Sequence, residues 1–376
     1  MSDLLKQSKY DRAERIIWWD QSKLRAAKVL VVGAGALGNE IVKNLALVGV
    51  GHISIVDMDE IEHTNLSRCV FFREGDEGLA KSTVLAREAM RMNPDVATTA
   101  YTFSVQTLGD GSLVDFDLII AGLDNREARV WLGSAARRVG KTWIDGAIEG
   151  LMGKVQTFTP TGPCYACTMS EKDWELVAKR KSCTLLGVDE IIAGHTPTNA
   201  TTSSIIAGIE SQEAIKYLVE KPELYALENK VWRMVGEQMS TFFSVIEEDE
   251  YCPYHFENRD IVRDVQTPSR LHELWKLLEL DGDHALRFFD DFILISPCVK
   301  CGGEPKIGFA DLMKKQGKCA NCESTLEVDS LFNISPDSAE SMLELDPNFL
   351  PLKTIVEFVA AESTVRYRLV RDGMSQ

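Results

Sequence analysis

A set of acidic, amide and basic side chains in the N-terminal part of the sequence has the composition of a site for a nucleoside triphosphate and a metal ion. Its members are Asp57, Asp59, Asn65, Arg68, Lys81, Asp124 and Asn125. Carboxylate oxygens are preferred ligands of Mg²⁺, and arginine and lysine side chains bind phosphate. This set suits ATP with Mg²⁺ better than the nicotinamide cofactor of a dehydrogenase.

Several of these side chains also have a purely structural interpretation. Asp59 could cap a loop, and Arg68 could pair on the surface with Glu60 or Glu62. Lys81 could lie on the solvated face of a helix. Only the joint spacing of the set favours the functional interpretation.

Residues 28–59 are the stretch that must position this set, and they read as strand, glycine turn, helix and strand. The Gly-x-Gly-x-x-Gly turn consists of Gly33, Gly35 and Gly38. Such a turn places phosphate at a helix N-terminus, where free backbone N–H groups and the helix dipole favour negative charge. Asp57 follows at the distance at which an acid reaches ribose hydroxyls.

The alternation of strands and helices up to residue 145 predicts an α/β fold with a doubly wound, mostly parallel, Rossmann-like sheet. Asp124 and Asn125 follow the fourth expected strand, 116–121. They therefore lie at the same carboxyl edge as Asp57, where open parallel sheets bind ligands. We also expect an amphipathic helix over residues 4–19 and a hairpin over residues 353–370.

Two groups of cysteines have the spacing of zinc ligands. The first comprises Cys164, Cys167, Cys252 and His255, and the second comprises Cys298, Cys301, Cys319 and Cys322. Both ligand sets are complete, so we expect two structural Zn²⁺ sites rather than catalytic ones.

Charge and hydropathy limit the partners and the location. The net charge is −16, which disfavours nucleic acid as the main partner. No apolar run approaches 18 residues, and the N-terminus has no signal-peptide core. We expect a cytoplasmic protein with no membrane partner.

Residues 1–258 resemble the adenylation domain of ubiquitin-activating enzymes and the bacterial sulfur-carrier adenylyltransferases of molybdopterin and thiamine synthesis. The matching stretches are Tyr10-Asp11-Arg12, GAGALG at 33–38, DMD at 57–59, NLSR at 65–68, Lys81, MNP at 92–94, LDN at 123–125 and the helix at 200–218. The resemblance implies that ATP adenylates the C-terminal carboxylate of a ubiquitin-like protein.

The resemblance also implies roles for single residues. Asp57 and Asp59 match acids near the ribose, and Asp124 matches the magnesium ligand. Arg12 matches an arginine that reaches the γ-phosphate from the opposite subunit, although Ala13 replaces the family's glutamine and Arg15 is a rival. The phosphate contacts fall on Asn65, Arg68 and Lys81.

Cys183 lies in the sequence Lys-Arg-Lys-Ser-Cys-Thr-Leu, and the preceding cations would favour its thiolate. This context resembles the thioester-forming cysteine of ubiquitin-activating enzymes, which implies transfer to a conjugating enzyme. The alternatives are a free cysteine in a basic loop, and a sulfur-carrier adenylyltransferase that stops at the acyl-adenylate. Cys69 is interpreted as structural.

Two domains follow from these patterns. Residues 1–260 form the adenylation domain, in which the crossover segment 168–202 carries Cys183. Residues 261–376 form a smaller α+β zinc-ribbon domain, either a β-grasp-like domain that recruits a conjugating enzyme or a dimerisation or docking module. The family works in pairs, so we expect a homodimer, with an inactive heteropartner as the alternative.

Overall fold

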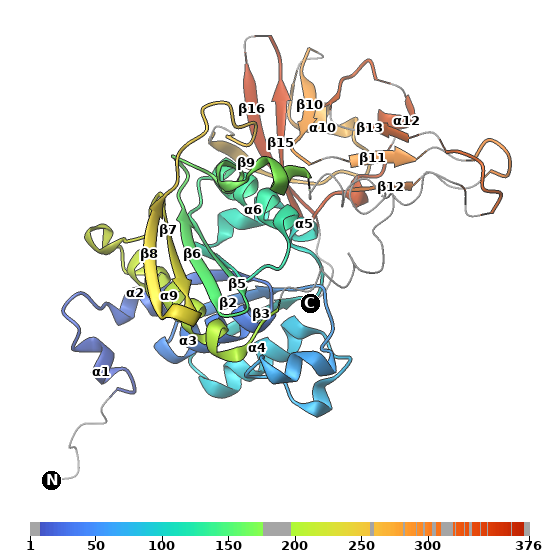
Figure 1. Ribbon diagram of the computed structural model, residues 1–376. Coiled ribbons are helices and arrows are strands. Elements are labelled where there is room, and N and C mark those ends of the chain that lie inside the picture. The colour runs from blue at the N-terminus through green and yellow to red at the C-terminus, as the bar shows by residue number, and fades with distance from the viewer. Residues whose placement is uncertain are drawn as a thin grey trace. The chain divides into compact units, whose positions relative to one another are not determined.

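The structure is a computed structural model (Figure 1). It describes residues 8–175, 197–255, 259–280, 283–290, 292–295, 298–302, 306–309, 319, 321–326, 328–330, 333–338, 340–343, 345–361 and 363–371. The described residues divide into two compact units. The first lies within Met1–Gln106, Leu113–Met169 and Asp189–Asn258, and the second within Thr107–Ser112, Ser170–Val188 and Arg259–Gln376.

The first unit is built on an eight-stranded sheet with the order β3-β2-β1-β4-β5-β6-β7-β8. The strands are β1 (Lys28–Val32), β2 (His52–Val56), β3 (Ala97–Tyr101), β4 (Leu118–Ala121), β5 (Trp143–Glu149), β6 (Met152–Phe158), β7 (Lys230–Val235) and β8 (Ser240–Val245). The first five are parallel, and β6, β7 and β8 are antiparallel. The predicted fold class, a Rossmann-like sheet that is mostly parallel, is confirmed.

Helices cover both faces of this sheet. Their bounds are α2 (Gln21–Ala26), α3 (Ala36–Val48), α4 (Lys81–Met92), α5 (Val105–Leu108), α6 (Arg126–Arg138) and α9 (Ala200–Leu218). α3 packs beside both α4 and α9. Asp145 of β5 contacts α6 and the next residue, Gly146, faces α9, so α6 and α9 lie on opposite faces.

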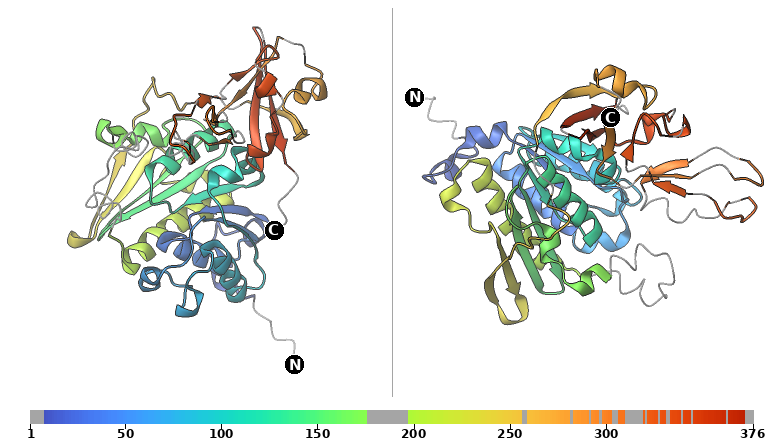
Figure 2. Two further views of the ribbon diagram at one scale, coloured as in Figure 1. Left: turned by 90° about the vertical axis from the view of Figure 1, so that its right-hand side faces the viewer. Right: turned by 90° about the horizontal axis from the view of Figure 1, so that it is seen from above.

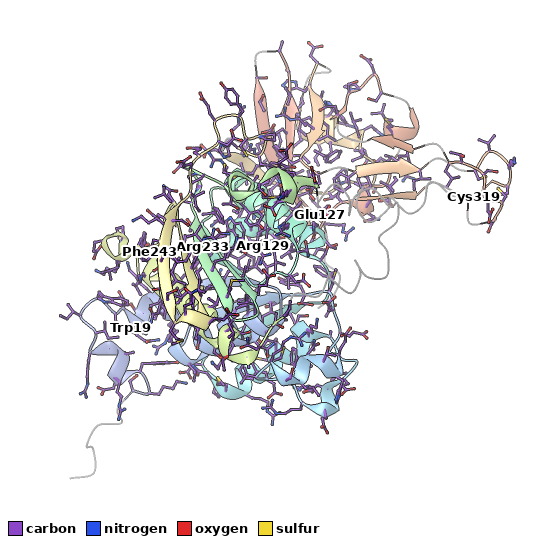
Figure 3. The ribbon with its side chains drawn as sticks, in the orientation of Figure 1. Trp19, Glu127, Arg129, Arg233, Phe243 and Cys319 are labelled. Carbon is purple, nitrogen blue, oxygen red and sulfur yellow. The ribbon has the colours of Figure 1, made fainter. Side chains whose placement is uncertain are left out.

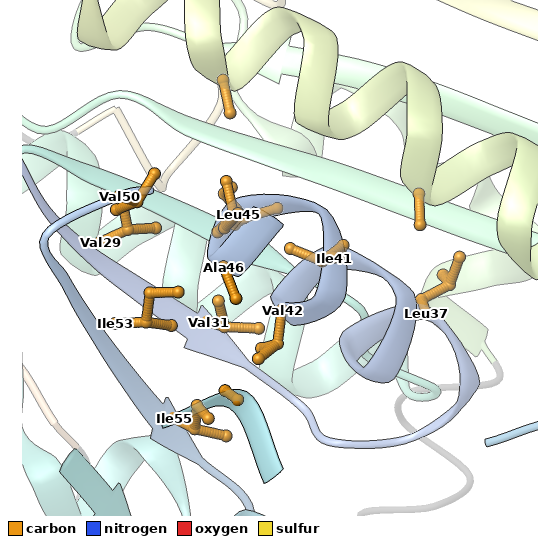
Figure 4. Close-up of a cluster of buried hydrophobic side chains, with 14 of the residues drawn as sticks. Val29, Val31, Leu37, Ile41, Val42, Leu45, Ala46, Val50, Ile53 and Ile55 are labelled. Carbon is orange, nitrogen blue, oxygen red and sulfur yellow. The ribbon is translucent and has the colours of Figure 1, made fainter. Parts of the chain in front are cut away.

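A buried apolar cluster holds α3 against the sheet. Val42 and Ala46 follow the helical repeat and point from α3 toward the buried strands β1 and β2, while Leu37 and Leu45 point toward α9 (Figure 4). Gly49 ends the helix in the left-handed conformation, with φ of 78°. This packing fixes the start of α3 relative to the end of β1, which is where the glycine turn lies.

The expected amphipathic helix over residues 4–19 is wrong for the residues that the structure describes. Between residues 8 and 20 the only helix is the short α1 (Asp11–Glu14). Ile16 and Ile17 are exposed, whereas Trp18 is partly buried and packs against the core of the first unit, so these apolar positions do not form one helical face. A four-residue helix gains little on its own, because helix nucleation is costly.

The second unit contains two smaller sheets with the orders β14-β10-β15-β16-β9 and β12-β11-β13. The strands are β9 (Ile261–Gln266), β10 (Ala285–Phe288), β11 (Phe292–Ile295), β12 (Lys306–Phe309), β13 (Val328–Ser330), β14 (Asn333–Ile334), β15 (Lys353–Val359) and β16 (Thr364–Val370), and the helices are α10 (Glu273–Leu277) and α12 (Glu340–Leu343). β15 and β16 form the predicted hairpin. A β-grasp assignment stays a prediction.

None of the helices in the described part of the chain is both long enough and apolar enough to cross a membrane.

Candidate functional site

The glycine turn lies where the strand order of the sheet reverses. Val32, the last residue of β1, is opposite Val56 on β2 and Ala121 on β4. The residues that follow these three strands therefore meet at one edge, and β1 and β4 flank the point at which parallel sheets bind ligands. Gly33 directly follows Val32, and Asp57 directly follows Val56.

Each of the three glycines of the turn has different surroundings, which explain why the position is a glycine. Gly33 has φ of 97°, and a Cβ there would lie 2.6 Å from the carbonyl oxygen of Gly122. A Cβ at Gly38 would lie 1.9 Å from the carbonyl oxygen of Gly33, so the helix packs directly on the turn. Gly35 has no neighbour within 4 Å of a built Cβ. The open side of Gly35, at the uncapped start of α3, therefore leaves room for a phosphate, and phosphate binding there stays a prediction.

Asp57 organises this turn through its carboxylate. Its Oδ2 accepts a hydrogen bond from the backbone N–H of Ala34 at 2.6 Å, and its Oδ1 accepts one from the N–H of Asp59 at 2.8 Å. Burial raises the pKa of Asp57, and these two hydrogen bonds and Lys81 oppose that rise. Asp57 thus holds the turn in shape while lying at the predicted ribose position.

Asp59 and Lys81 form an ion pair at the same edge. Lys81 Nζ lies 2.9 Å from Asp59 Oδ2, and the backbone N–H of Lys81 donates to the carbonyl of Asp59. The Lys81 side chain is 12% exposed and that of Asp59 is 55% exposed. Lys81 is therefore not on a solvated helix face, which was its structural interpretation.

Asn65 and Arg68 lie in and just after a short 3₁₀ helix, His63–Ser67. Asn65 is buried, and its Oδ1 accepts a hydrogen bond from the N–H of Glu62 at 3.0 Å. Arg68 is half-buried and donates to the carbonyl of Thr64. In the structure Arg68 is therefore bonded to the backbone rather than to the neighbouring acids, and its phosphate role stays a prediction.

Asp124 and Asn125 follow β4 and precede α6. Asp124 is exposed, and its role as a magnesium ligand stays a prediction. Asn125 instead caps α6, since its Oδ1 accepts a hydrogen bond from the N–H of Ala128 at 2.7 Å. The structure gives Asn125 a structural task, and its contact with a nucleotide stays a prediction.

Sequence reasoning missed the role of Asn39, whose side chain hydrogen-bonds to the backbone of the glycine turn. The buried Asn39 donates to the carbonyls of Ala34 and Gly35 at 2.9 and 3.1 Å, and its Oδ1 accepts from the N–H of Phe71 at 3.1 Å. Its position next to Gly38 was visible in the sequence. Its side-chain partners were not, because Phe71 lies in a distant loop.

Sequence reasoning also missed a buried polar network under the site. Arg129 of α6 donates to Asp145 Oδ1 at 2.7 Å, and Gln156 of β6 donates to Asp145 Oδ2 at 2.8 Å. Arg129 further donates to the carbonyls of Leu123 and Gly146. This network ties the loop that carries Asp124 to the interior of β5 and β6.

The structure does not place the remaining predicted side chains at this edge within the residues that it describes. Arg12 is exposed on α1, and Arg15 pairs with Asp11 at 2.7 Å. Cys183 lies outside the described residues. Cys69 is buried and burial raises its pKa to about 11, which supports its interpretation as a structural thiol.

The first cysteine cluster comes together as predicted. Cys164 Sγ lies 3.8 Å from Cys167 Sγ and 3.6 Å from Cys252 Sγ, and Cys167 Sγ lies 3.1 Å from His255 Nε2. Tetrahedral Zn–S bonds of about 2.3 Å place two sulfurs about 3.8 Å apart. The four donors therefore fit Zn²⁺, and a closed set of four ligands fits a structural role.

The second cluster, in the second unit, is also assembled. Cys298 Sγ lies 3.5 Å from Cys322 Sγ, and Cys301 Sγ lies 3.4 Å from Cys319 Sγ. All four sulfurs lie within 4.8 Å of one another. This set is thiolate-only and closed, and it fits Zn²⁺ of the ribbon type.

The edge of the sheet thus offers an open helix N-terminus, a carboxylate at the ribose position, a lysine and an exposed aspartate. This combination can hold a nucleoside triphosphate with its phosphates at Gly35. Residues 10–254 match the model of the ThiF family. The chain belongs to the ThiF family. The family resemblance inferred from the motifs is confirmed.

Curated relatives agree with this assignment. The chain is 38% identical over 150 residues to a NEDD8-activating enzyme E1 catalytic subunit of Schizosaccharomyces pombe, which covers 38% of this chain and 34% of that protein. It is 30% identical over 226 residues to a SAMP-activating enzyme E1 of Haloferax volcanii, covering 58% of this chain and 79% of that protein. The chain thus spans about a third of the first relative and most of the second.

A third relative is named as an adenylyltransferase rather than as an activating enzyme. The chain is 35% identical over 154 residues to a sulfur carrier protein adenylyltransferase of Thermus thermophilus, covering 39% of this chain and 57% of that protein. Among solved structures, E. coli MccB with ATP aligns with a TM-score of 0.55 and 21% identity, over 68% of this chain and 75% of that one. At that identity the match shows a shared fold.

Proposed function

We propose that this ThiF-family chain is an enzyme that uses ATP and Mg²⁺ to adenylate the C-terminal carboxylate of a ubiquitin-like or sulfur-carrier protein. The observation that carries the proposal is the open side of Gly35 at the sheet edge, flanked by the Asp59–Lys81 pair and by Asp124. The names of its relatives, which include activating enzymes and an adenylyltransferase, support the same reaction.

In this reaction one carboxylate oxygen attacks the α-phosphorus of ATP. The P–O bond to the β-phosphate breaks, and pyrophosphate leaves with the electron pair of that bond. No general base is required, because the carboxylate is already ionised at neutral pH. Catalysis therefore consists of positioning and charge stabilisation.

The residues divide this work. Asp57 and Asp59 hold the ribose, and the start of α3 binds the α-phosphate. The outgoing phosphates are contacted by Asn65, Arg68 and Lys81. To do so, Lys81 gives up its ion pair with Asp59 and binds a phosphate oxygen instead. Mg²⁺, held through Asp124, supplies charge neutralisation for the leaving pyrophosphate when it is bound.

The test is ATP–pyrophosphate exchange with a panel of candidate carrier proteins. Asp124→Ala should lower the exchange rate by about 10³-fold, on the scale of losing one strong electrostatic contact, without lowering the melting temperature. Asp95→Ala is the matched control, since Asp95 is an exposed acid just before β3, at the opposite edge of the sheet. Normal exchange in Asp124→Ala would exclude this edge as the active site.

For the second step we propose that Cys183 attacks the acyl-adenylate, forms a thioester and releases AMP, after which the carrier passes to a conjugating enzyme. Its basic sequence context supports this assignment. Cys183→Ala should abolish a carrier conjugate that is stable on non-reducing gels and lost on reduction. A conjugate that persists in that variant rules Cys183 out.

The alternative is a sulfur-carrier adenylyltransferase, which stops at the acyl-adenylate. It predicts that the wild-type chain releases AMP only when a sulfur donor is added and that no thioester forms. The Thermus relative favours this alternative, whereas the activating-enzyme relatives favour the thioester.

For the whole protein we propose a cytoplasmic homodimer, or a pair with an inactive partner, in which Arg12 reaches the γ-phosphate bound by the other subunit. The exposed position of Arg12 is compatible with such a role. We assign adenylation to residues 1–260 and partner recruitment to residues 261–376. Analytical ultracentrifugation, and exchange assays that mix Arg12→Ala with Asp124→Ala chains, test the pairing.

A further inference from the structure

Two cations lie directly opposite one another in the antiparallel half of the large sheet. Lys154 of β6 is the cross-strand partner of Arg233 of β7, so their side chains project from the same face. Like charges in such a pair are destabilising. Figure 3 labels Arg233 on β7 and Arg129 on the neighbouring α6.

No acid within the described residues compensates this pair by direct contact. Lys154 makes no ion pair there, and its ammonium lies 5.9 Å from the centre of the Tyr165 ring. Arg233 donates to Ser244 Oγ at 3.4 Å, which is a contact with a neutral group. The nearby Asp145 already accepts hydrogen bonds from Arg129 and Gln156, one at each oxygen.

The electrostatics of Lys154 agree with this geometry. Burial lowers the pKa of Lys154, and Arg129, Arg233 and Arg126 act in the same direction, while Asp145 opposes them. An anion placed between Lys154 and Arg233 would relieve both the burial cost and the repulsion. The pair is therefore arranged for a ligand rather than for the stability of the free protein.

Lys154 and Arg233 also lie level with the carboxyl edge of the parallel strands, where the candidate nucleotide site lies. Asp145 of β5 is opposite Ala121, the last residue of β4, and Ala147 is opposite Lys154. Lys154 is thus two residues beyond the end of β4, which is the level of the loop that carries Asp124. It shares the face of the sheet on which Asp145 meets α6.

The distance along this edge can be converted into residues of an extended peptide. In the strand order the β1–β4 junction and the β6–β7 junction are three strand spacings apart. Neighbouring strands lie about 4.8 Å apart, so the two junctions are separated by about 14 Å. An extended chain rises about 3.3 Å per residue, so this span corresponds to about four residues.

We propose that Lys154 and Arg233 bind an acidic side chain of the incoming carrier protein, about four residues before its C-terminal carboxylate. This inference rests on the proposed adenylation. It assigns the strands β6 and β7 a role in selecting substrates whose C-terminal tails carry Asp or Glu at that position.

The experiment uses the full-length protein and three synthetic ten-residue peptides that end in a free carboxylate. They differ only at the fifth residue from the end, which is Glu, Gln or Lys, and each carries an N-terminal fluorophore. Binding is followed by fluorescence anisotropy in the presence of ATP, and the same peptides serve as substrates for pyrophosphate exchange.

The Glu peptide should bind about tenfold or more tightly than the Gln peptide, and more weakly as salt rises. Lys154→Met and Arg233→Gln should each reduce this preference without changing the KM for ATP. The double variant Lys154→Glu with Arg233→Glu should prefer the Lys peptide. Lys230→Gln, an exposed position on the same β7, is the matched control and should keep the wild-type preference.

Equal binding of the three peptides to the wild-type protein, or no measurable binding of the Glu peptide, would overturn the inference. It would also be overturned if the variants weakened ATP instead, because the anion would then be a phosphate. Failure of the proposed function has a different signature, namely peptide binding without any ATP–pyrophosphate exchange by either peptides or carrier proteins.

Discussion

The parallel and antiparallel halves of the eight-stranded sheet differ in how their polar side chains are used. At the ends of β1 and β2, Asp57 is bonded to two backbone amides and Asp59 is paired with Lys81. In β6 and β7, Lys154 and Arg233 instead repel each other across the strands. β8 is the outermost strand of this half (Figure 2). Its Phe243 and Val245 are exposed.

The proposed function accounts for this difference, because it gives the two halves different ligands. A nucleotide is small and the same for every turnover, so its site can be held in shape by the protein's own hydrogen bonds. A protein tail is long and brings its own charges, so a surface that selects it leaves charges and apolar groups without internal partners. On the proposed function the parallel half is preorganised for the nucleotide, and the antiparallel half is completed by the tail of the carrier protein.

The largest effect should come from breaking the first cysteine cluster, whose four donors fit Zn²⁺. This cluster joins Cys164, just after β6, to Cys252, just after β8, and so closes the antiparallel half. Zinc binding is coupled to folding. Cys252→Ser should lower the melting temperature by about 10 °C or more, since 1 kcal/mol corresponds to about 2–4 °C for a unit of this size.

Hydrogen exchange by mass spectrometry locates the effect. Peptides from β6–β8 should lose protection in Cys252→Ser, while peptides from β1–β4 keep most of theirs. Cys319→Ser removes the same chemical group from the second cluster, and it should leave the first unit unchanged. Equal loss of protection in both halves would show that the two halves unfold as one.

The next effect separates packing from ligand binding within the parallel half. Gly38→Ala places a methyl group 1.9 Å from the carbonyl oxygen of Gly33, so the turn must shift. Overpacking of this kind costs about 1–3 kcal/mol, measurable by urea unfolding. Gly35→Ala meets no protein atom within 4 Å and should keep full stability.

Gly35→Ala should nevertheless raise the KM for ATP, because its methyl group occupies the space assigned to phosphate. Isothermal calorimetry with a non-hydrolysable ATP analogue measures this directly. Unchanged ATP affinity in Gly35→Ala would place the phosphates elsewhere.

The order of these elements in the sequence was enough to predict the parallel half. Strand, glycine turn, helix and Asp57 are contiguous, so local pattern determines their geometry. The cysteine clusters could be predicted equally well, because zinc ligands have a characteristic spacing in the sequence. These parts depend on short-range order along the chain.

The antiparallel half could not be predicted in the same way. The pairing of Lys154 with Arg233 depends on the register between strands that are far apart in sequence, and one residue of slippage would put the two side chains on opposite faces. The Arg129–Asp145–Gln156 network likewise requires three elements to be placed first. The helix expected over residues 4–19 failed in its described part, where Ile16 and Ile17 are exposed and Trp18 packs against the core from outside any helix.

A smaller, pH-dependent effect should appear at the border between the halves. Glu210 of α9 is fully buried against the backbone of Gly146, and no side chain among the described residues hydrogen-bonds its carboxylate oxygens. Burial raises its pKa, and repulsion from Asp145 adds to the rise. The protonated form is therefore favoured in the folded state.

The folded state thus binds a proton that the unfolded chain releases above its ordinary pKa of about 4.3. The stability from this group is complete below that pH and is lost as the pH rises toward the folded-state pKa. Relative to the wild type, Glu210→Gln should gain up to about 1.4 kcal/mol per pH unit in this window. Urea unfolding at pH 5, 6, 7 and 8 measures it, and parallel curves for the two proteins would contradict it.

The smallest effect concerns Phe243 of the antiparallel half, for which the buried Phe158 of the same half is the comparison. Phe243 on β8 is 58% exposed, so Phe243→Ser should change the free energy of unfolding by less than about 0.5 kcal/mol. Phe158 on β6 is 2% exposed and stacks on Trp143 at 4.9 Å between ring centroids, so Phe158→Ala should cost about 3–5 kcal/mol. Both values come from urea unfolding under one condition. A cost above about 2 kcal/mol for Phe243→Ser, well beyond what an exposed position explains, would mean that β8 contributes to the stability of the free chain. The antiparallel half would then be as complete on its own as the parallel half.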